Sequence, residues 1–273
     1  MTNNKEQFGK RQRAYGLTIL TARVPMNKSY WIGPDGRIAK SDYRNALFFD
    51  AMPQRLDSLL ELWLMLQLAS DGANKCIIRG VPDIEVAQTA ALDPEDDLVR
   101  GQVRPSLIQN CKRQMRLFKE PKGGNNWIML DFDDLEVPPA VGDPNTEASI
   151  EWAIREHLPP EFQCASYIYQ FSNSAGLIQP DGSPYKPGLC VHLFFLLEKP
   201  LTNAQLKKWL ADTPIDKSLL NAVQVHYVAN PKLEAGVRCI LKERMGRVEK
   251  EHETVKRPPE FEPQLEMELV DEP

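Results

Sequence analysis

The sequence lacks a long apolar run. No stretch reaches the ~18 consecutive apolar residues that a membrane-spanning helix needs. The opening residues, MTNNKEQFGKRQR, are polar and have none of the apolar middle region that a secretory signal peptide carries. We therefore expect a cytoplasmic protein with no membrane partner.

Cysteine is scarce and scattered. Five cysteines are present, and no two of them have the C-x-x-C spacing typical of zinc ligands and redox pairs. The sequence also lacks the G-x-x-x-x-G-K-[ST] loop of P-loop nucleotide-binding enzymes. We therefore expect no zinc site, no disulfide framework and no P-loop helicase within this chain.

The net charge of −5 is unevenly distributed. Residues 247–273 hold four basic and nine acidic side chains, together with several prolines, which predicts an acidic linker or tail outside the core. Residues 100–122 hold seven basic side chains and one acidic side chain. Such a cluster suits a polyanion, although many are simply solvated faces. The basic residues predicted to contact nucleic acid are Arg104, Lys112, Arg113, Arg116 and Lys119.

The most informative stretch that is present is WIMLDFDD, residues 127–134. Its apolar half predicts a buried strand that ends in three carboxylates within four positions. Side chains alternate faces along a strand, so Asp131 and Asp133 share one face and Asp134 points the other way. Two anions about 7 Å apart on one face repel each other unless a cation lies between them. The pattern indicates either an acidic loop or a carboxylate pair that binds Mg²⁺ or Mn²⁺, with Asp134 structural.

The pattern of apolar residues predicts an α+β (α/β) fold in three parts. Residues 1–125 form an N-terminal α/β subdomain, with short strands at 45–51 and 76–79 and a helix over 54–70 that is apolar around most of its girth, hence buried. Residues 126–246 form the second part, and 247–273 the tail. The elements expected in the second part are strand 127–132, helix 146–157, strands 165–171 and 189–197, a helix from Thr202 with Gln205 completing a capping box, and strand 223–228.

This order is βαββαβ, the split-βαβ arrangement of ferredoxin-like and RNA-recognition-like domains. The first and third strands are adjacent in that topology, so His192 is expected beside Asp131 and Asp133. The long connection after Phe171 contains Ser172, Ser174 and Lys186, whose side chains can bind phosphate oxygens.

Asp216 follows Thr-Pro-Ile and has two possible roles. It is either a helix cap, the usual role of an Asp at such a position, or a third metal-binding carboxylate. The sequence alone leaves both open.

Taken together, these motifs resemble the archaeo-eukaryotic-type primases, in the primase-polymerase form carried by plasmids, phages and other mobile elements. The hydrophobic-DxD motif matches residues 128–133, the small-x-His motif matches Cys190-Val191-His192, and the hydrophobic-acidic motif matches Ile215-Asp216. The segments CIIRG, RQMRLFKEP and VHYVANP are also reminiscent of these enzymes. The similarity extends over residues 16–239.

The resemblance implies a DNA primase/polymerase that makes, and possibly extends, primers on a single-stranded DNA template. Asp131, Asp133 and Asp216 would hold two Mg²⁺ or Mn²⁺ ions, and His192 would contact the triphosphate of the incoming NTP or dNTP. Ser172, Ser174, Lys186 and Cys190 would help to bind the nucleotide, and a helicase would act in cis or in trans. Cys190 departs from the family, which usually has Ser there, and a thiol is the weaker hydrogen-bond donor.

The same residues allow other functions. The first is a catalytically inactive, primase-derived module that binds single-stranded nucleic acid during replication initiation. The second is an aspartate-nucleophile phosphatase, which is disfavoured because Leu135 stands where its DxDx[T/V] signature needs Thr or Val. A rolling-circle nuclease is disfavoured because His192 and His226 do not form a His-hydrophobic-His pair.

Overall fold

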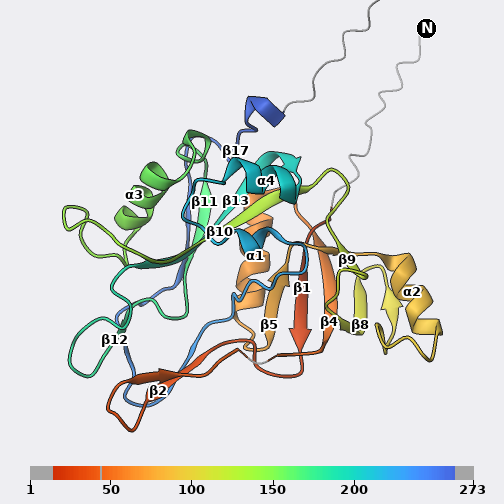
Figure 1. Ribbon diagram of the computed structural model, residues 1–273, viewed down its shortest axis with the longest axis horizontal. Coiled ribbons are helices and arrows are strands. Elements are labelled where there is room, and N and C mark those ends of the chain that lie inside the picture. Colours follow the sequence, from red (N-terminus) through yellow and green to blue (C-terminus); the bar gives the residue numbers. More distant parts are fainter. Residues whose placement is uncertain (1–14, 44, 262–273) are drawn as a thin grey trace, which may run out of the picture.

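The computed structural model describes residues 15–43 and 45–261, and two antiparallel-rich sheets dominate it (Figure 1). The first sheet has the strand order β5-β1-β4-β8-β7. Its strands are β1 (Tyr15–Ala22), β4 (Phe48–Arg55), β5 (Lys75–Ile78), β7 (Val103–Arg104) and β8 (Leu107–Lys112). The predicted strands at 45–51 and 76–79 correspond to β4 and β5.

The second sheet has the order β10-β13-β11-β16, and β17 pairs in parallel with the far end of β13. Its strands are β10 (Asn125–Leu135), β11 (Tyr167–Phe171), β13 (Leu189–Leu201), β16 (Met245–Val248) and β17 (Thr254–Val255). The first and third predicted strands, now β10 and β13, are antiparallel neighbours, which confirms their expected adjacency.

Five layers follow from the way apolar side chains are shared. Helix α1 (Leu59–Ser70) lies between the two sheets, because its leucines pack with Leu17 and Ile19 of β1 and with Trp127 and Met129 of β10. Helix α2 (Ile84–Leu92) covers the outer face of the first sheet. Helices α3 (Glu147–His157) and α4 (Asn203–Trp209) cover the outer face of the second sheet. The molecule is a mixed α+β protein.

The two predicted helix starts of the second part are confirmed. Thr146 caps α3 by accepting the Ser149 N–H, and the helix ends before Pro159. Thr202 and Gln205 form the expected capping box of α4. These ends are set locally, because a side-chain oxygen at the cap satisfies an N–H that the helix leaves unpaired.

The prediction for α1 was only partly right. The helix begins at Leu59, because residues 54 and 55 still belong to β4, and Ser58 caps it. It buries one face, but Leu60, Leu64 and Leu68 on the other face are 50%, 49% and 42% exposed. Two sheets contact α1 along part of its girth and leave this stripe uncovered.

The predicted strand at 223–228 is wrong. Its only strand-like pairing among the described residues is a single bridge between His226 and Ile77 of β5, in the first sheet, and Val223 lies in a turn. Val225 is buried in the cluster that α2 shares with the first sheet, and Val228 is buried in the cluster between the two sheets. Alternating apolar residues report burial without specifying which sheet provides the partner.

The predicted acidic tail is wrong for its first half. Residues 245–248 form β16 against β11, and β17 pairs with β13. Val255 is fully buried, and Phe261 is 9% exposed. Residues 247–261 therefore pack along the second sheet, with Val255 and Phe261 in its core, while 262–273 lie outside the described residues.

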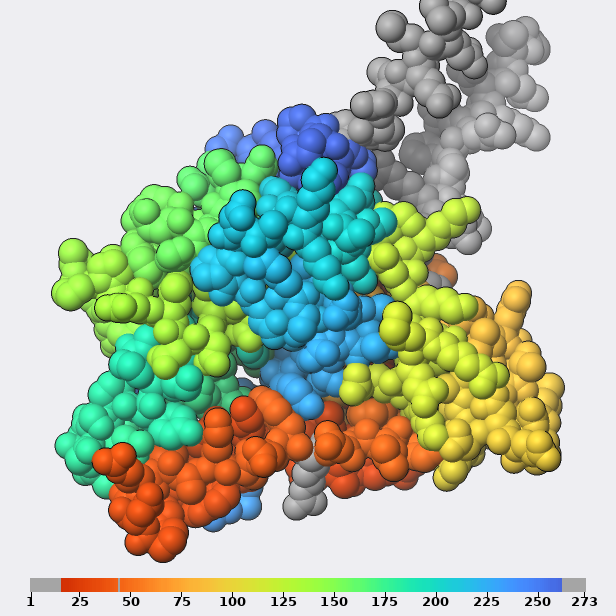
Figure 2. All heavy atoms as spheres, viewed as in Figure 1, coloured from red at the N-terminus to blue at the C-terminus, as the bar shows by residue number. Residues whose placement is uncertain are grey.

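Short strands also pair outside the two main sheets, and one of these pairings joins segments that lie about 200 residues apart in the sequence. Strands β2 (Ser29–Ile32) and β3 (Ile38–Lys40) form a hairpin, and β14 (Lys232–Leu233) pairs in parallel with β2. In Figure 2 the red-orange N-terminal segment runs along the lower edge of the visible face, beneath the green and blue segments. Within the described ranges, no helix is long and apolar enough to cross a membrane.

Candidate functional site

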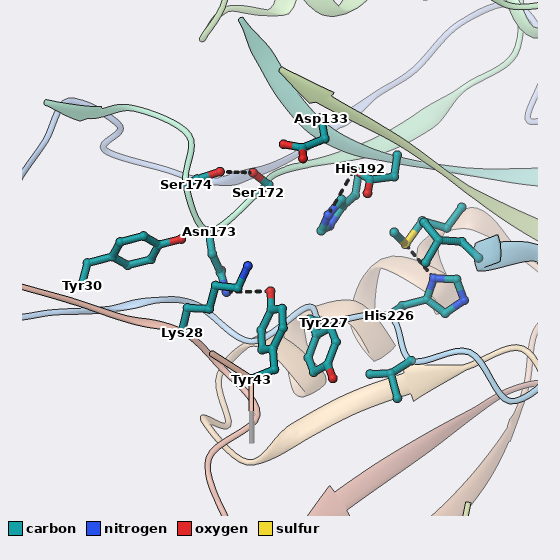
Figure 3. A pocket seen from close by; sticks show the side chains of 14 residues that line it. Lys28, Tyr30, Tyr43, Asp133, Ser172, Asn173, Ser174, His192, His226 and Tyr227 are labelled. Atoms are coloured by element: carbon teal, nitrogen blue, oxygen red, sulfur yellow. Dashed lines mark hydrogen bonds and ion pairs between the residues drawn. The ribbon is translucent and has the colours of Figure 1, made fainter. Parts of the chain in front are cut away.

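A polar cleft of about 170 Å³ lies where the ends of β10 and β13 meet the N-terminal part of the chain (Figure 3). Its lining comes from two parts of the chain, residues 28–43 and residues 129–227. The lining residues with polar side chains are Lys28, Tyr30, Tyr43, Asp131, Asp133, Ser172, Asn173, Ser174, His192, His226 and Tyr227.

Asp131 and His192 lie side by side on the neighbouring strands β10 and β13. They are direct partners in the β10–β13 register, and His192 Nε2 lies 3.6 Å from Asp131 Oδ1. This confirms the prediction that the histidine lies beside the carboxylates. Burial is the main cause that raises the pKa of Asp131 above its usual value, and the charges of Asp133 and Asp216 add to it, against His192 and Lys28.

A β-bulge interrupts β10 directly after these two residues. The register shifts between Phe132 and Leu135, and Asp134 adopts a left-handed φ of 63°. Strict alternation therefore fails at this point, yet Asp133 still lines the cleft with Asp131. Asp134 does not line it. Its Oδ1 accepts a 2.8 Å hydrogen bond from the Gly188 N–H, which is the structural role expected of it.

Cys190 contacts the bulge and does not line the cleft. This position differs from the one that its predicted nucleotide-binding role requires. The residue is 1% exposed, and its Sγ accepts a hydrogen bond of 3.2 Å from the Asp134 N–H. Burial, with smaller effects from Asp133 and Asp134, raises the pKa of the thiol to about 11. A neutral sulfur at this position acts through the backbone of the bulge.

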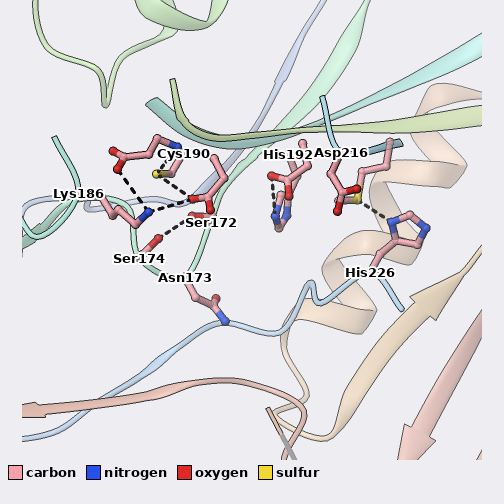
Figure 4. Close-up of polar contacts among 12 residues, drawn as sticks. Ser172, Asn173, Ser174, Lys186, Cys190, His192, Asp216 and His226 are labelled. Carbon is pink, nitrogen blue, oxygen red and sulfur yellow. Dashed lines mark hydrogen bonds and ion pairs between the residues drawn. The ribbon is translucent and has the colours of Figure 1, made fainter. Parts of the chain in front are cut away.

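Lys186 lies beside the carboxylates but outside the cleft lining. Its Nζ is 3.5 Å from Asp133 Oδ1 and 3.4 Å from Asp134 Oδ2 (Figure 4). The charge predicted to bind phosphate is thus compensated by two carboxylates.

The predicted serines form one rim of the cleft. Ser172 Oγ and Ser174 Oγ are 3.1 Å apart, and the Ser172 N–H donates to the Cys190 carbonyl at 2.9 Å. Arg244, which the sequence did not single out, donates to the carbonyls of Ser172 and Ala175 at 2.7 and 3.1 Å. The arginine fixes the backbone of the loop and leaves both hydroxyls facing the cleft.

The helix-cap role of Asp216 is confirmed, and its metal-binding role stays a prediction. It precedes η2 (Lys217–Leu220), and its carboxylate accepts from the Ser218 N–H at 2.8 Å and the Ser218 hydroxyl at 2.9 Å. It does not line the cleft, although its charge is close enough to raise the Asp131 pKa. Figure 4 shows Asp216 next to His192 in projection.

The N-terminal wall of the cleft was not predicted. Tyr43 stacks on Tyr227 with ring centroids 3.5 Å apart and planes within 5°, and Lys28 Nζ lies 4.4 Å from the Tyr43 centroid. His226 is 1% exposed, and burial lowers its pKa to about 3, so its imidazole is neutral. The sequence Val225-His226-Tyr227 was the signal that could have identified His226 and Tyr227. No local motif identifies Lys28 or Tyr43 as site residues.

Part of the predicted nucleic-acid segment is paired with acidic residues. Lys112 and Arg100 contact Asp97, Arg116 lies 2.6 Å from Asp96, and Lys119 lies 2.8 Å from Asp83. The remaining predicted residues also have partners: Arg113 donates to the Val223 carbonyl, and Arg104 donates to Gln102. Three carboxylates of residues 83–97 therefore pair with four of the seven basic side chains of residues 100–122.

The cleft offers hard oxygen donors but no complete metal shell. Within the described part of the chain, no three His, Cys, Asp or Glu side chains are grouped closely enough to hold a metal ion as they stand. Asp131 and Asp133 are the carboxylates that face the cleft together. Carboxylate oxygens are the ligands that Mg²⁺ and Mn²⁺ prefer, and Mg²⁺ commonly uses one or two of them with substrate oxygens and water.

Comparison of the chain with protein-family models, with curated proteins and with solved structures finds no match.

Proposed function

We propose that the protein is a metal-dependent nucleotidyltransferase that makes primers on single-stranded DNA. The observation that carries this proposal is the arrangement at the end of β10. Asp131 and Asp133 face one cleft, and His192 lies in register with Asp131. Paired carboxylates beside a histidine on a sheet face are the arrangement that the resemblance to primase-polymerases implies.

The residues present fit a divalent cation. Two carboxylates in one cleft, one with a pKa raised by burial, form a site that a cation stabilises. Asp131 and Asp133 would hold Mg²⁺ or Mn²⁺, which would supply positive charge to the triphosphate oxygens during nucleotidyl transfer.

The protein's own side chains orient the nucleotide. His192 uses Nε2 toward Asp131, and its buried Nδ1 has no hydrogen-bond partner among the described residues. An orphaned buried nitrogen of this kind suits a hydrogen bond to a ligand. The hydroxyls of Ser172 and Ser174 and the amide of Asn173 add neutral hydrogen-bonding groups on the opposite rim.

The fold supports this reading at the level of topology. Elements β10, α3, β11, β13 and α4 follow one another in the order of an RNA-recognition-like unit up to its fourth strand. The fourth strand is replaced at a different place in the sheet, because β16 pairs with β11 at the opposite edge and β17 pairs with β13. We assign catalysis to this unit. Single-stranded DNA, an NTP or dNTP and a helicase in cis or in trans are the proposed partners, and residues 100–122 are the proposed contact with DNA.

A second function has its own supporting observation. Lys186 pairs with Asp133, His192 pairs with Asp131, and Cys190 stands where the family has Ser. A site whose charges compensate one another fits a catalytically inactive module that binds single-stranded nucleic acid.

The two functions are separated by incubation with single-stranded DNA, labelled nucleotides and Mn²⁺, followed by a denaturing gel. The enzyme produces a ladder of short products. The binding module shifts the DNA in a native gel and incorporates nothing with any template, nucleotide or metal.

A further inference from the structure

Lys28 differs from the other lysine near the carboxylates. Lys186 is paired with Asp133 and Asp134. Lys28 lines the cleft itself, and no carboxylate of residues 15–43 and 45–261 lies within ion-pair distance of its Nζ. It is thus a partly buried cation that faces a ligand-sized space with no carboxylate in direct contact.

The position of Lys28 is fixed from two sides. Its carbonyl accepts the Lys232 N–H at 2.9 Å, and the neighbouring Asn27 amide donates to the Asn230 carbonyl at 2.7 Å. These bonds tie the start of β2 to the β14 strand. The segment that carries Lys28 is therefore held at the mouth of the cleft by the returning chain.

The aromatic wall holds the lysine side chain. One face of Tyr43 stacks on Tyr227, and Lys28 Nζ lies over a Tyr43 ring that also accepts a 3.5 Å hydrogen bond from Asn173 at its hydroxyl. A ring with both faces in use has no free face for a nucleobase. The stack therefore serves as a support for a cation, through a cation–π contact.

Partial burial makes the charged form of Lys28 costly. Burial is the main cause that lowers the pKa of Lys28, and Lys40 and Lys186 contribute in the same direction, against Asp133 and Asp42. A partly buried ammonium group that has no carboxylate in direct contact is stabilised when an anionic ligand binds to it.

We propose that Lys28 forms a phosphate-binding subsite on the N-terminal side of the cleft. The subsite rests on the proposed function in that the phosphate belongs either to a nucleotide triphosphate or to the backbone of single-stranded DNA. A phosphate held there lies between Lys28 and the residues of β10 and β13. The bound ligand therefore contacts the N-terminal segment and the second sheet at the same time.

The test is equilibrium binding, measured in Mg²⁺ by isothermal titration calorimetry with two probes. The probes are inorganic tripolyphosphate and an unphosphorylated single-stranded oligonucleotide. Lys28→Met is compared with Lys28→Arg and with Lys232→Met, which removes an equal charge from a 66% exposed lysine. Loss of one charge-assisted hydrogen bond predicts about tenfold weaker binding for Lys28→Met, with Lys28→Arg and Lys232→Met near the wild type.

The two probes identify the source of the phosphate. Weakening for tripolyphosphate assigns the subsite to the nucleotide, and weakening for the oligonucleotide assigns it to the DNA backbone. The inference is overturned if Lys28→Met binds both probes as the wild type does, or if the folded wild type binds neither. Because binding is read without synthesis, a wild type that binds but makes no primer contradicts the proposed function alone.

Discussion

At the scale of single residues, Asp131 combines burial with charge. Its pKa is raised chiefly by burial, with Asp133 and Asp216 adding to the effect. A carboxylate whose folded-state pKa is raised destabilises the fold once it ionises. The ionised Asp131 therefore places a negative charge in the cleft and lowers the stability of the fold, as expected at a functional site.

This gives a prediction for Asp131→Asn. The ordinary Asp pKa is about 3.9, so the folded wild type loses stability relative to the variant as the pH rises from there through the raised pKa. We expect the variant to have the higher thermal midpoint at pH 7, with the difference disappearing below about pH 4. Thermal unfolding across pH measures it, and a variant less stable than the wild type at pH 7 contradicts the assignment.

Metal addition provides a second residue-scale prediction. A ligand that binds the folded state alone raises its stability by mass action. Millimolar Mn²⁺ should raise the thermal midpoint of the wild type and leave that of the double variant Asp131→Asn/Asp133→Asn unchanged. Equal shifts in both proteins would place the ion elsewhere.

At the scale of elements, the bulge in β10 sets the site. Asp134 turns the backbone at φ 63°, and Gly188 lies against it so closely that a Cβ there would be 2.6 Å from the Asp134 carbonyl carbon. The end of the loop between β11 and β13 thus packs closely against β10, and this close approach requires a glycine at position 188.

Gly188→Ala tests this fit. Backbone atoms cannot yield as a flexible side chain can, so we expect about 1–3 kcal/mol of destabilisation from overpacking. Displacement of the bulge should also reduce nucleotide incorporation more than the loss of folded protein explains. Chemical denaturation and activity per folded molecule separate the two effects. Gly182→Ala is the matched control, since its added Cβ meets nothing within 4 Å, although its φ of 87° carries its own strain.

Local signals explain which elements the sequence could predict. The capping residues Thr146 and Thr202 define helix starts by themselves, and the apolar run at 127–132 defines β10. The adjacency of His192 to Asp131 followed from the order of the elements. The bulge could not be predicted, because it depends on Gly188 and Cys190, which lie more than fifty residues away along the chain.

At the scale of the whole molecule, non-local pairing decided the remaining outcomes. The segment at 223–228 joins the first sheet, and residues 247–261 return to the second sheet, although their composition suggested a tail. The N-terminal wall of the cleft is assembled from Lys28, Tyr43 and Tyr227, which no sequence spacing connects.

Charge distribution yields a prediction at this scale. Asp97 pairs with Arg100 and Lys112 and thereby reduces the attraction of this surface for a polyanion. Asp97→Asn should strengthen binding to single-stranded DNA several-fold at low salt, and the gain should shrink as salt screens the contact. Fluorescence anisotropy over a salt series measures this. Asp212→Asn, which changes an exposed aspartate, is the control, and an equal gain in both variants would remove residues 100–122 from the DNA-binding surface.

The most direct measurement of the central claim is primer synthesis by four proteins: the wild type, Asp131→Ala, Asp133→Ala and Asp212→Ala. Each is incubated with single-stranded DNA, labelled nucleotides and Mn²⁺, after circular dichroism has established that it is folded. We predict a ladder of short products from the wild type and Asp212→Ala. Both cleft variants should lose at least about a hundredfold in activity, because loss of a group that only supports a metal ligand already costs about 10–100-fold. A ladder of undiminished intensity from Asp131→Ala and Asp133→Ala would contradict the account.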